Sequence, residues 1–152
     1  DLGCGTKKIA PWATGVDDGS ESTHFRDQIV KARVDPASRE LEKQFKPESF
    51  DVVFSSHTLE HILSPLLDTI RYWTTFVRPG GRLIMYLPDE DRYQYDPKNP
   101  KVKNPGHFHL LTPKAFLALL PDLADELVLE SFEEDPRIFD HYSFLVVLRK
   151  AT

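Results

Sequence analysis

The sequence predicts a three-layer α/β domain with a mostly parallel sheet, and three observations support this fold class. Apolar runs of strand length alternate with segments whose apolar residues recur at helical spacing, a pattern typical of parallel sheets flanked by helices. The clearest run, residues 50–56, is rich in β-branched and aromatic residues, as expected for a strand buried on both faces. The length of 152 residues suits one domain.

The expected elements follow one another in a regular order. After a strand end and glycine turn at residues 1–6, we expect strands at 13–17, 28–34, 50–56, 82–87, 126–132 and 141–148, and helices at 38–45, 64–77 and 112–120. Ser64 and Thr112 each precede a proline, which predicts an N-cap followed by proline at the first helical position. The loop between the last two strands is too short for a crossover helix, so the last strand should run antiparallel.

Composition narrows the class of partner. The formal net charge of −5 and the pI of about 5.7 give no sign of a basic face for nucleic acid, which favours a small-molecule or protein substrate. Cys4 is the only cysteine, so neither an intrachain disulfide nor a cysteine zinc site is expected, and a reducing, cytoplasmic location fits. The apolar runs are too short to span a bilayer, so no membrane partner is expected.

A glycine loop and an acid mark a nucleoside site. Gly3 and Gly5 allow a ligand to approach the main chain, and Asp17 follows at the end of the next strand, where an acid can bind ribose hydroxyls. Lys8 stands where the NAD-binding pattern G-x-G-x-x-G requires its third glycine, which argues against NAD. If only the two glycines are considered, an ordinary tight turn is the alternative to a nucleoside-binding loop.

Longer motifs carry a resemblance to a known family. Residues 1–5 resemble the first motif of class I S-adenosylmethionine (SAM)-dependent methyltransferases, and residues 15–17 resemble the motif of their second strand. Residues 50–62, with their Leu-Glu-His sequence, look like the fourth strand and its turn, and residues 78–83 resemble the turn into the fifth strand. The resemblance, strongest to the type 11 group, implies a Rossmann-like sandwich and SAM as cofactor.

The resemblance also implies which residues bind the cofactor. The methionine portion would lie near the first motif, the ribose near the acid of the second strand, and the adenine near Asp35 after the third. The alternative for Asp35 is an acid that caps the turn beside Pro36. Carried over by position, the cofactor-binding residues are Asp1, Gly3, Cys4, Gly5, Asp17, Asp35, Ser55, Ser56 and His57. Because the chain begins at a strand end without methionine, we expect upstream sequence that includes most of the first strand.

The expected reaction is in-line methyl transfer to an oxygen or nitrogen of a small-molecule acceptor. His107 and His109 lie near the end of the long loop at residues 88–111 and are the candidate general bases, with partly buried histidines of a structural turn as the alternative. Alternatives are a non-catalytic module that binds SAM or a partner, and, less favoured, an NAD-dependent oxidoreductase. The sequence does not indicate the oligomeric state.

A metal site is a second alternative, suggested by His57, Glu60 and His61. On an α-helix these residues would share one face at a spacing that suits metal ligands. Some ubiquinone-type O-methyltransferases resemble this segment, with glutamate at the position of His57, and use the acid–acid–histidine set for a metal. The preferred interpretation is that Glu60 and His61 hydrogen-bond the backbone and fix the turn, so no metal is expected.

Overall fold

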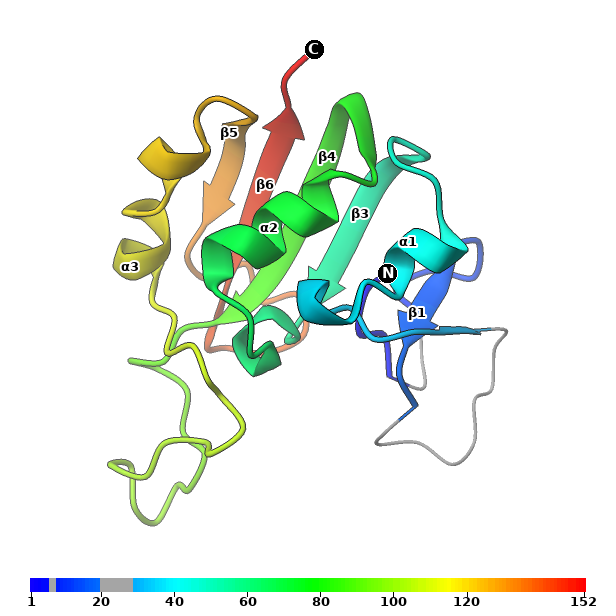
Figure 1. Ribbon diagram of the computed structural model, residues 1–152. Helices are drawn as coiled ribbons and strands as arrows, with labels where there is room; N and C mark the ends of the chain where they lie inside the picture. Colours follow the sequence, from blue (N-terminus) through cyan, green and yellow to red (C-terminus); the bar gives the residue numbers. More distant parts are fainter. Residues whose placement is uncertain (6–7, 20–28) are drawn as a thin grey trace.

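The computed structural model describes residues 1–5, 8–19 and 29–152, and Figure 1 shows their arrangement. The strands are β1 (Gly15–Asp17), β2 (Ile29–Lys31), β3 (Phe50–Ser56), β4 (Val77–Pro88), β5 (Leu127–Glu133) and β6 (Ser143–Lys150). The α-helices are α1 (Leu41–Gln44), α2 (Leu66–Thr74) and α3 (Pro113–Leu117), and the 3₁₀ helices are η1 (Pro36–Ser38), η2 (Leu59–His61) and η3 (Leu120–Leu123).

The sheet is parallel on one side and antiparallel on the other. β1 pairs with β2 and β3 with β4 in parallel, and the larger group has the order β3-β4-β6-β5. β6 runs antiparallel to both of its neighbours, which confirms the prediction for the last strand. Leu2 makes parallel bridges to Val16 and Ser55, so the start of the chain joins β1 to β3.

The predicted strand at residues 50–56 is confirmed as β3, but β4 begins earlier than expected. We expected residues 78–81 to form a turn, whereas β4 runs through them from Val77. Gly80 has a φ of 73°, and the register with β3 shifts between Phe50 and Val52. The glycines therefore bend the strand without ending it, as in a bulge.

The helices are shorter than predicted, and one predicted cap is wrong. Pro65 is the N-cap of α2, while the Ser64 hydroxyl donates a hydrogen bond to Asp35 Oδ1 at 2.6 Å. The prediction for Thr112 is confirmed, because its side chain accepts from the Ala115 N–H at 3.1 Å. Arg39, in the left-handed region with a φ of 52°, separates η1 from α1, so only Leu41–Gln44 of the expected helix at 38–45 are α-helical.

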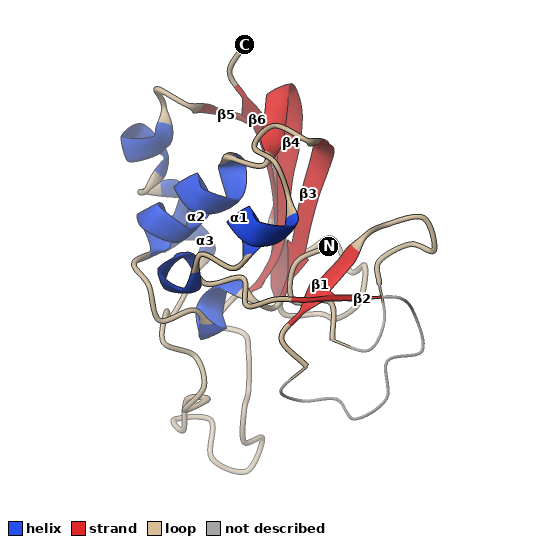
Figure 2. Cartoon of the chain, turned by 45° about the vertical axis from the view of Figure 1, so that its right-hand side comes forward, coloured by secondary structure: helices blue, strands red, loops and turns tan. Residues whose placement is uncertain are grey.

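All helices that the structure describes lie on one face of the larger sheet, as Figure 2 shows. The core fills the space between them and includes Ile70 and Trp73 from α2, Phe116 from α3, and Leu83 and Met85 from β4, each 0% exposed. The second helical layer expected from the sequence remains a prediction, because no described helix covers the other face. No helix among the described residues is long and apolar enough to cross a membrane.

Candidate functional site

A cleft of about 370 Å³ lies where β1, β2 and β3 end. In open α/β sheets, ligands bind outside the carboxyl ends of the strands. The cleft is lined by Gly3, Gly5, Asp17, Asp18, Ala32, Arg33, Val34, Asp35, His57, Thr58, His61, Ile62, Leu63 and Phe108. It combines a few polar groups with apolar walls, as small-molecule sites commonly do.

The glycine loop forms one wall of this cleft. Gly3 and Gly5 have φ values of 65° and 56°, in the left-handed region that favours glycine. A side chain at Gly3 would overlap Thr58, whose hydroxyl donates to the Ser56 carbonyl at 3.0 Å. A Cβ at Gly5 would meet nothing within 4 Å, so the main chain there is open to a ligand.

Asp17 fixes the loop and faces the cleft at the end of β1. Its Oδ2 accepts from the Gly5 N–H at 2.9 Å, and its Oδ1 accepts from the Gly19 N–H at 2.8 Å. Each carboxylate oxygen can accept a second hydrogen bond, so both oxygens keep capacity for ligand hydroxyls. Burial, reinforced by the negative charge of Asp17, raises the pKa of the nearby Cys4 thiol.

Asp35 lines the cleft but is already occupied by protein donors. Its Oδ1 accepts from the Ser64 hydroxyl and from the Ala37 N–H at 2.8 Å. Burial alone would raise the pKa of Asp35, but the hydrogen bonds from Ser64 and Ala37 outweigh it and lower the pKa. Asp35 therefore ties the end of β2 to the segment before α2.

Four of the nine expected cofactor residues do not line the cleft. Ser55 is 0% exposed, and it shares with Val53 the side of β3 that faces the core. Asp1, Cys4 and Ser56 line a neighbouring cavity of about 350 Å³, which shares Gly3 with the cleft. Strand alternation turns the Ser55 side chain inward, and this placement does not favour a cofactor contact by that side chain.

His57 lies directly after β3 in a strained conformation, with a φ of 48°. Its Nε2 lies 3.1 Å from Asp140 Oδ2 and 3.0 Å from Ser143 Oγ, and its Nδ1 lies 3.5 Å from Glu60 Oε1. Burial disfavours the imidazolium, but the carboxylates of Glu60 and Asp140 outweigh it and raise the pKa of His57.

The two candidate bases lie outside the cleft lining. His107 is buried, with its Nδ1 hydrogen-bonded to Glu90 Oε1 and its ring stacked on Tyr93. His109 Nε2 lies 3.0 Å from the Ser64 carbonyl oxygen, which anchors the loop before α3. Both histidines thus make structural contacts, and their catalytic role remains a prediction that this placement does not favour.

Sequence reasoning did not identify several residues that line the cleft. Ala32, Arg33 and Val34 follow β2, and Thr58 follows His57. Their position after strand ends was a usable signal, because parallel strands bring their carboxyl ends to one edge. It also did not place His107 beside Glu60 and His61, although the three offer ligand atoms within 4.8 Å of one another.

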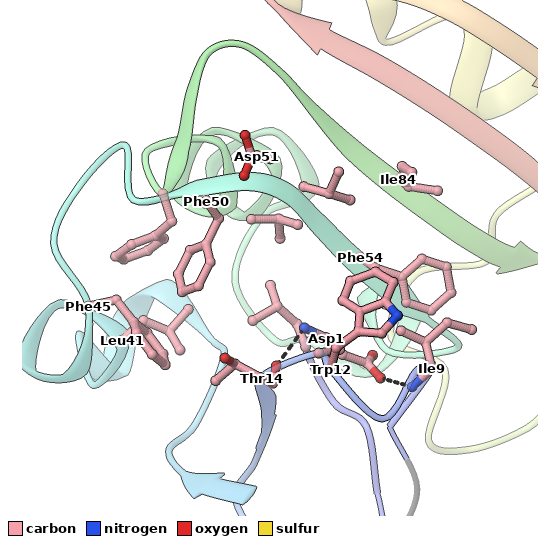
Figure 3. Close-up of a pocket in the computed structure, with 15 residues that line it drawn as sticks. Asp1, Ile9, Trp12, Thr14, Leu41, Phe45, Phe50, Asp51, Phe54 and Ile84 are labelled. Carbon is pink, nitrogen blue, oxygen red and sulfur yellow. Dashed lines mark hydrogen bonds between the residues drawn. The ribbon is translucent and has the colours of Figure 1, made fainter.

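A larger cavity of about 550 Å³ lies along the edge of β3 that faces away from β4, and Figure 3 shows it. It is lined mostly by apolar side chains, among them Trp12, Phe45, Phe50, Phe54 and Ile84. Asp1, one of its few polar groups, accepts from the Ile9 N–H at 2.5 Å. The cavity therefore lacks the converging polar groups that mark the smaller cleft.

Comparisons with known proteins agree with this geometry. The methyltransferase domain family matches residues 1–85. The ubiquinone biosynthesis O-methyltransferase of Aeromonas salmonicida is 30% identical over 97 residues, and the match covers 56% of this chain. The chain spans 40% of the length of that curated relative.

Solved structures show the same fold at low sequence identity. A SAM-dependent methyltransferase from Mesorhizobium loti has a TM-score of 0.63 at 18% identity, with 98% of this chain and 89% of that chain covered. One from Archaeoglobus fulgidus has a TM-score of 0.63 at 17% identity, with 99% and 84% covered. Because the family match extends over more than half of the 152 residues, the chain belongs to the class I methyltransferases, a family whose cofactor is SAM.

Proposed function

We propose that this chain binds SAM in the cleft and transfers its methyl group to an oxygen or nitrogen of a small-molecule acceptor. The observation that carries the proposal is the open main chain at Gly5, fixed by Asp17 at the carboxyl ends of the strands. Family membership supports the choice of cofactor. The name of the curated relative, an O-methyltransferase, favours an oxygen acceptor.

The lining of the cleft offers groups that suit each part of SAM. The methionine portion would approach the main chain at Gly3 and Gly5, where a side chain at Gly5 would occupy the open space. Asp17 would accept hydrogen bonds from the ribose hydroxyls. Val34 and Ile62 would form apolar walls for the adenine, with Asp35 holding that end of the cleft in shape.

Methyl transfer requires mainly that the protein hold the acceptor atom in line with the methyl group and the sulfur of SAM. When bound, SAM supplies an electrophilic methyl group on a sulfonium. The neighbouring cavity beside Ser56 and Phe139 shares Gly3 with the cleft and would hold the acceptor. Holding two reactants in line can contribute about 7–11 kcal/mol to lowering a barrier. We assign no general base, because neither His107 nor His109 lines the cleft.

Calorimetric titration with S-adenosylhomocysteine, beside NADH, tests the cofactor assignment. We expect micromolar binding of S-adenosylhomocysteine and none of NADH. Asp17→Ala should weaken binding about 10- to 150-fold, since hydrogen bonds to a charged group contribute about 1.5–3 kcal/mol. Asp51→Ala is the matched control, because Asp51 is an exposed acid on β3 outside the cleft. Equal affinity in wild type and Asp17→Ala would contradict the assignment.

Methyl transfer itself needs a second assay. Protein and radiolabelled SAM are incubated with a panel of phenols, alcohols and amines, and labelled product is counted. We expect product from at least one class and less from Asp17→Ala at limiting SAM. Cofactor binding without turnover across the panel would favour the alternative, a SAM-binding module without catalysis.

A further inference from the structure

The Glu60 carboxylate is buried without a hydrogen-bond donor. Its side chain is 0% exposed, and neither Oε1 nor Oε2 has a hydrogen-bond partner among the described residues. The nearest cationic candidates are His57 Nδ1 at 3.5 Å and His61 Nε2 at 3.8 Å. A buried carboxylate that accepts no hydrogen bond costs several kcal/mol, about the scale of a buried ion's desolvation, unless positive charge lies close to it.

His61 turns a lone pair toward this carboxylate. Its Nδ1 lies 2.8 Å from the Gly106 carbonyl oxygen, which can only accept, so Nδ1 carries the proton. In the neutral ring Nε2 is then an acceptor, and it faces Glu60 Oε1. Two acceptor atoms that face each other repel, and a cation bound by both atoms removes this repulsion.

His107, from the long loop, also has its Nδ1 hydrogen-bonded to an acceptor, as His61 does. Its Nδ1 donates to the carboxylate of Glu90, whose side chain is 2% exposed and lies 3.9 Å from Lys103 Nζ. This leaves Nε2 of the neutral ring without a proton. A carboxylate behind a histidine is the usual support of a metal-binding imidazole, because it fixes the ring and raises its basicity.

We propose that Glu60, His61 and His107 form a binding site for a divalent transition-metal ion. Their ligand atoms lie within 4.8 Å of one another, so a small closure would bring them to bonds of about 2.0–2.2 Å. Two imidazoles with one carboxylate favour zinc, iron, cobalt or manganese over magnesium and calcium, which prefer oxygen ligands.

The ligand set differs from the one that the sequence suggested. His57 is turned toward Asp140 and Ser143, and His107 enters from the long loop instead. His61 also lines the cleft, so the open coordination positions would lie at its rim. Polarising an acceptor oxygen there is a role that rests on the proposed function, whereas metal binding itself does not.

Titration of chelator-treated protein with Co²⁺, followed by visible absorption and by competition with Zn²⁺, tests the site. We expect a cobalt spectrum at one equivalent that Zn²⁺ displaces. His61→Ala should weaken binding at least about 10-fold, the lower bound for losing even a supporting residue of a metal site. Its side chain is 44% exposed, so the variant should fold, which circular dichroism would verify. His109→Ala is the control, because His109 contacts Ser64 and lies outside the cluster.

Two outcomes overturn the proposal. One is the absence of a cobalt spectrum in the wild type or an equal spectrum in His61→Ala. The other is binding of Mg²⁺ without Co²⁺ or Zn²⁺. Because the titration contains no SAM, its failure is distinct from the failure of S-adenosylhomocysteine to bind in the cleft.

Discussion

The two tryptophans of the chain lie in apolar regions of opposite character. Trp73, in α2, is 0% exposed, and its Nε1–H donates to the Val34 carbonyl oxygen at 2.8 Å. Trp12 is 86% exposed and lines the cavity along β3 together with Phe54, as Figure 3 shows. The side chains of the core beneath α2 are buried, whereas Trp12 on the apolar surface along β3 is exposed, so apolar character alone does not indicate burial.

The same contrast separates the cavity along β3 from the cleft. The cavity of about 550 Å³ is larger and more apolar, while the cleft of about 370 Å³ holds Asp17, Asp35 and the glycine loop. A ligand site needs a few polar groups that converge on one point as well as volume. The smaller hollow is therefore the better candidate for the cofactor.

Replacing Trp73 should produce the largest effect. Trp73→Ala removes a fully buried indole and leaves the Val34 carbonyl without its donor, so the free energy of unfolding should fall by about 3–5 kcal/mol. Trp12→Ala should change it by less than about 0.5 kcal/mol, as for other exposed side chains. Urea denaturation followed by circular dichroism measures both. A loss above 2 kcal/mol in Trp12→Ala would mean that the region along β3 is closed in solution.

Two neighbours on β4 sharpen the comparison. Leu83 is 0% exposed in the core, whereas Ile84 points to the other face and lines the cavity along β3. Leu83→Ala should lower the free energy of unfolding by about 2–5 kcal/mol, and Ile84→Ala by about 1 kcal/mol, because less packing is lost. The same urea measurement applies. Equal losses would show that both faces of β4 are packed alike.

Sequence patterning predicted the central strands well and the first part of the chain poorly. The run at residues 50–56 is continuous, so its bounds as β3 could be read directly, but burial on both faces was wrong, because Asp51 and Val52 are exposed. Within the described residues β2 covers Ile29–Lys31, whereas the strand was expected at 28–34, of which residue 28 lies outside the described part; short strands give no period to detect. The bend at Gly80 depends on pairing with β3, which is a tertiary effect absent from local sequence.

Some residues of the candidate site could be predicted from the sequence and others could not. Gly3, Gly5, Asp17, Asp35 and His57 line the cleft as the motifs suggested. Ser55 does not, although the motif includes it, because it faces the core. The meeting of Glu60 with a histidine 47 positions later could not be read from spacing, since the path of the long loop decides it.

The smallest expected effect concerns Cys4, between the cleft and the region along β3. Burial and then the charge of Asp17 raise the pKa of its thiol, so less thiolate is present at a given pH than in an unfolded chain. The rate of reaction with Ellman's reagent should therefore rise with pH through a midpoint above that of the urea-unfolded protein.

Asp17→Asn should lower that midpoint, because the negative charge that disfavours the thiolate is gone. Loosening of the glycine loop would instead speed labelling at every pH without moving the midpoint, so the full pH profile separates the two causes. An unchanged midpoint would mean that burial alone sets the pKa of Cys4 and that the charge of Asp17 is screened by solvent in the open cleft.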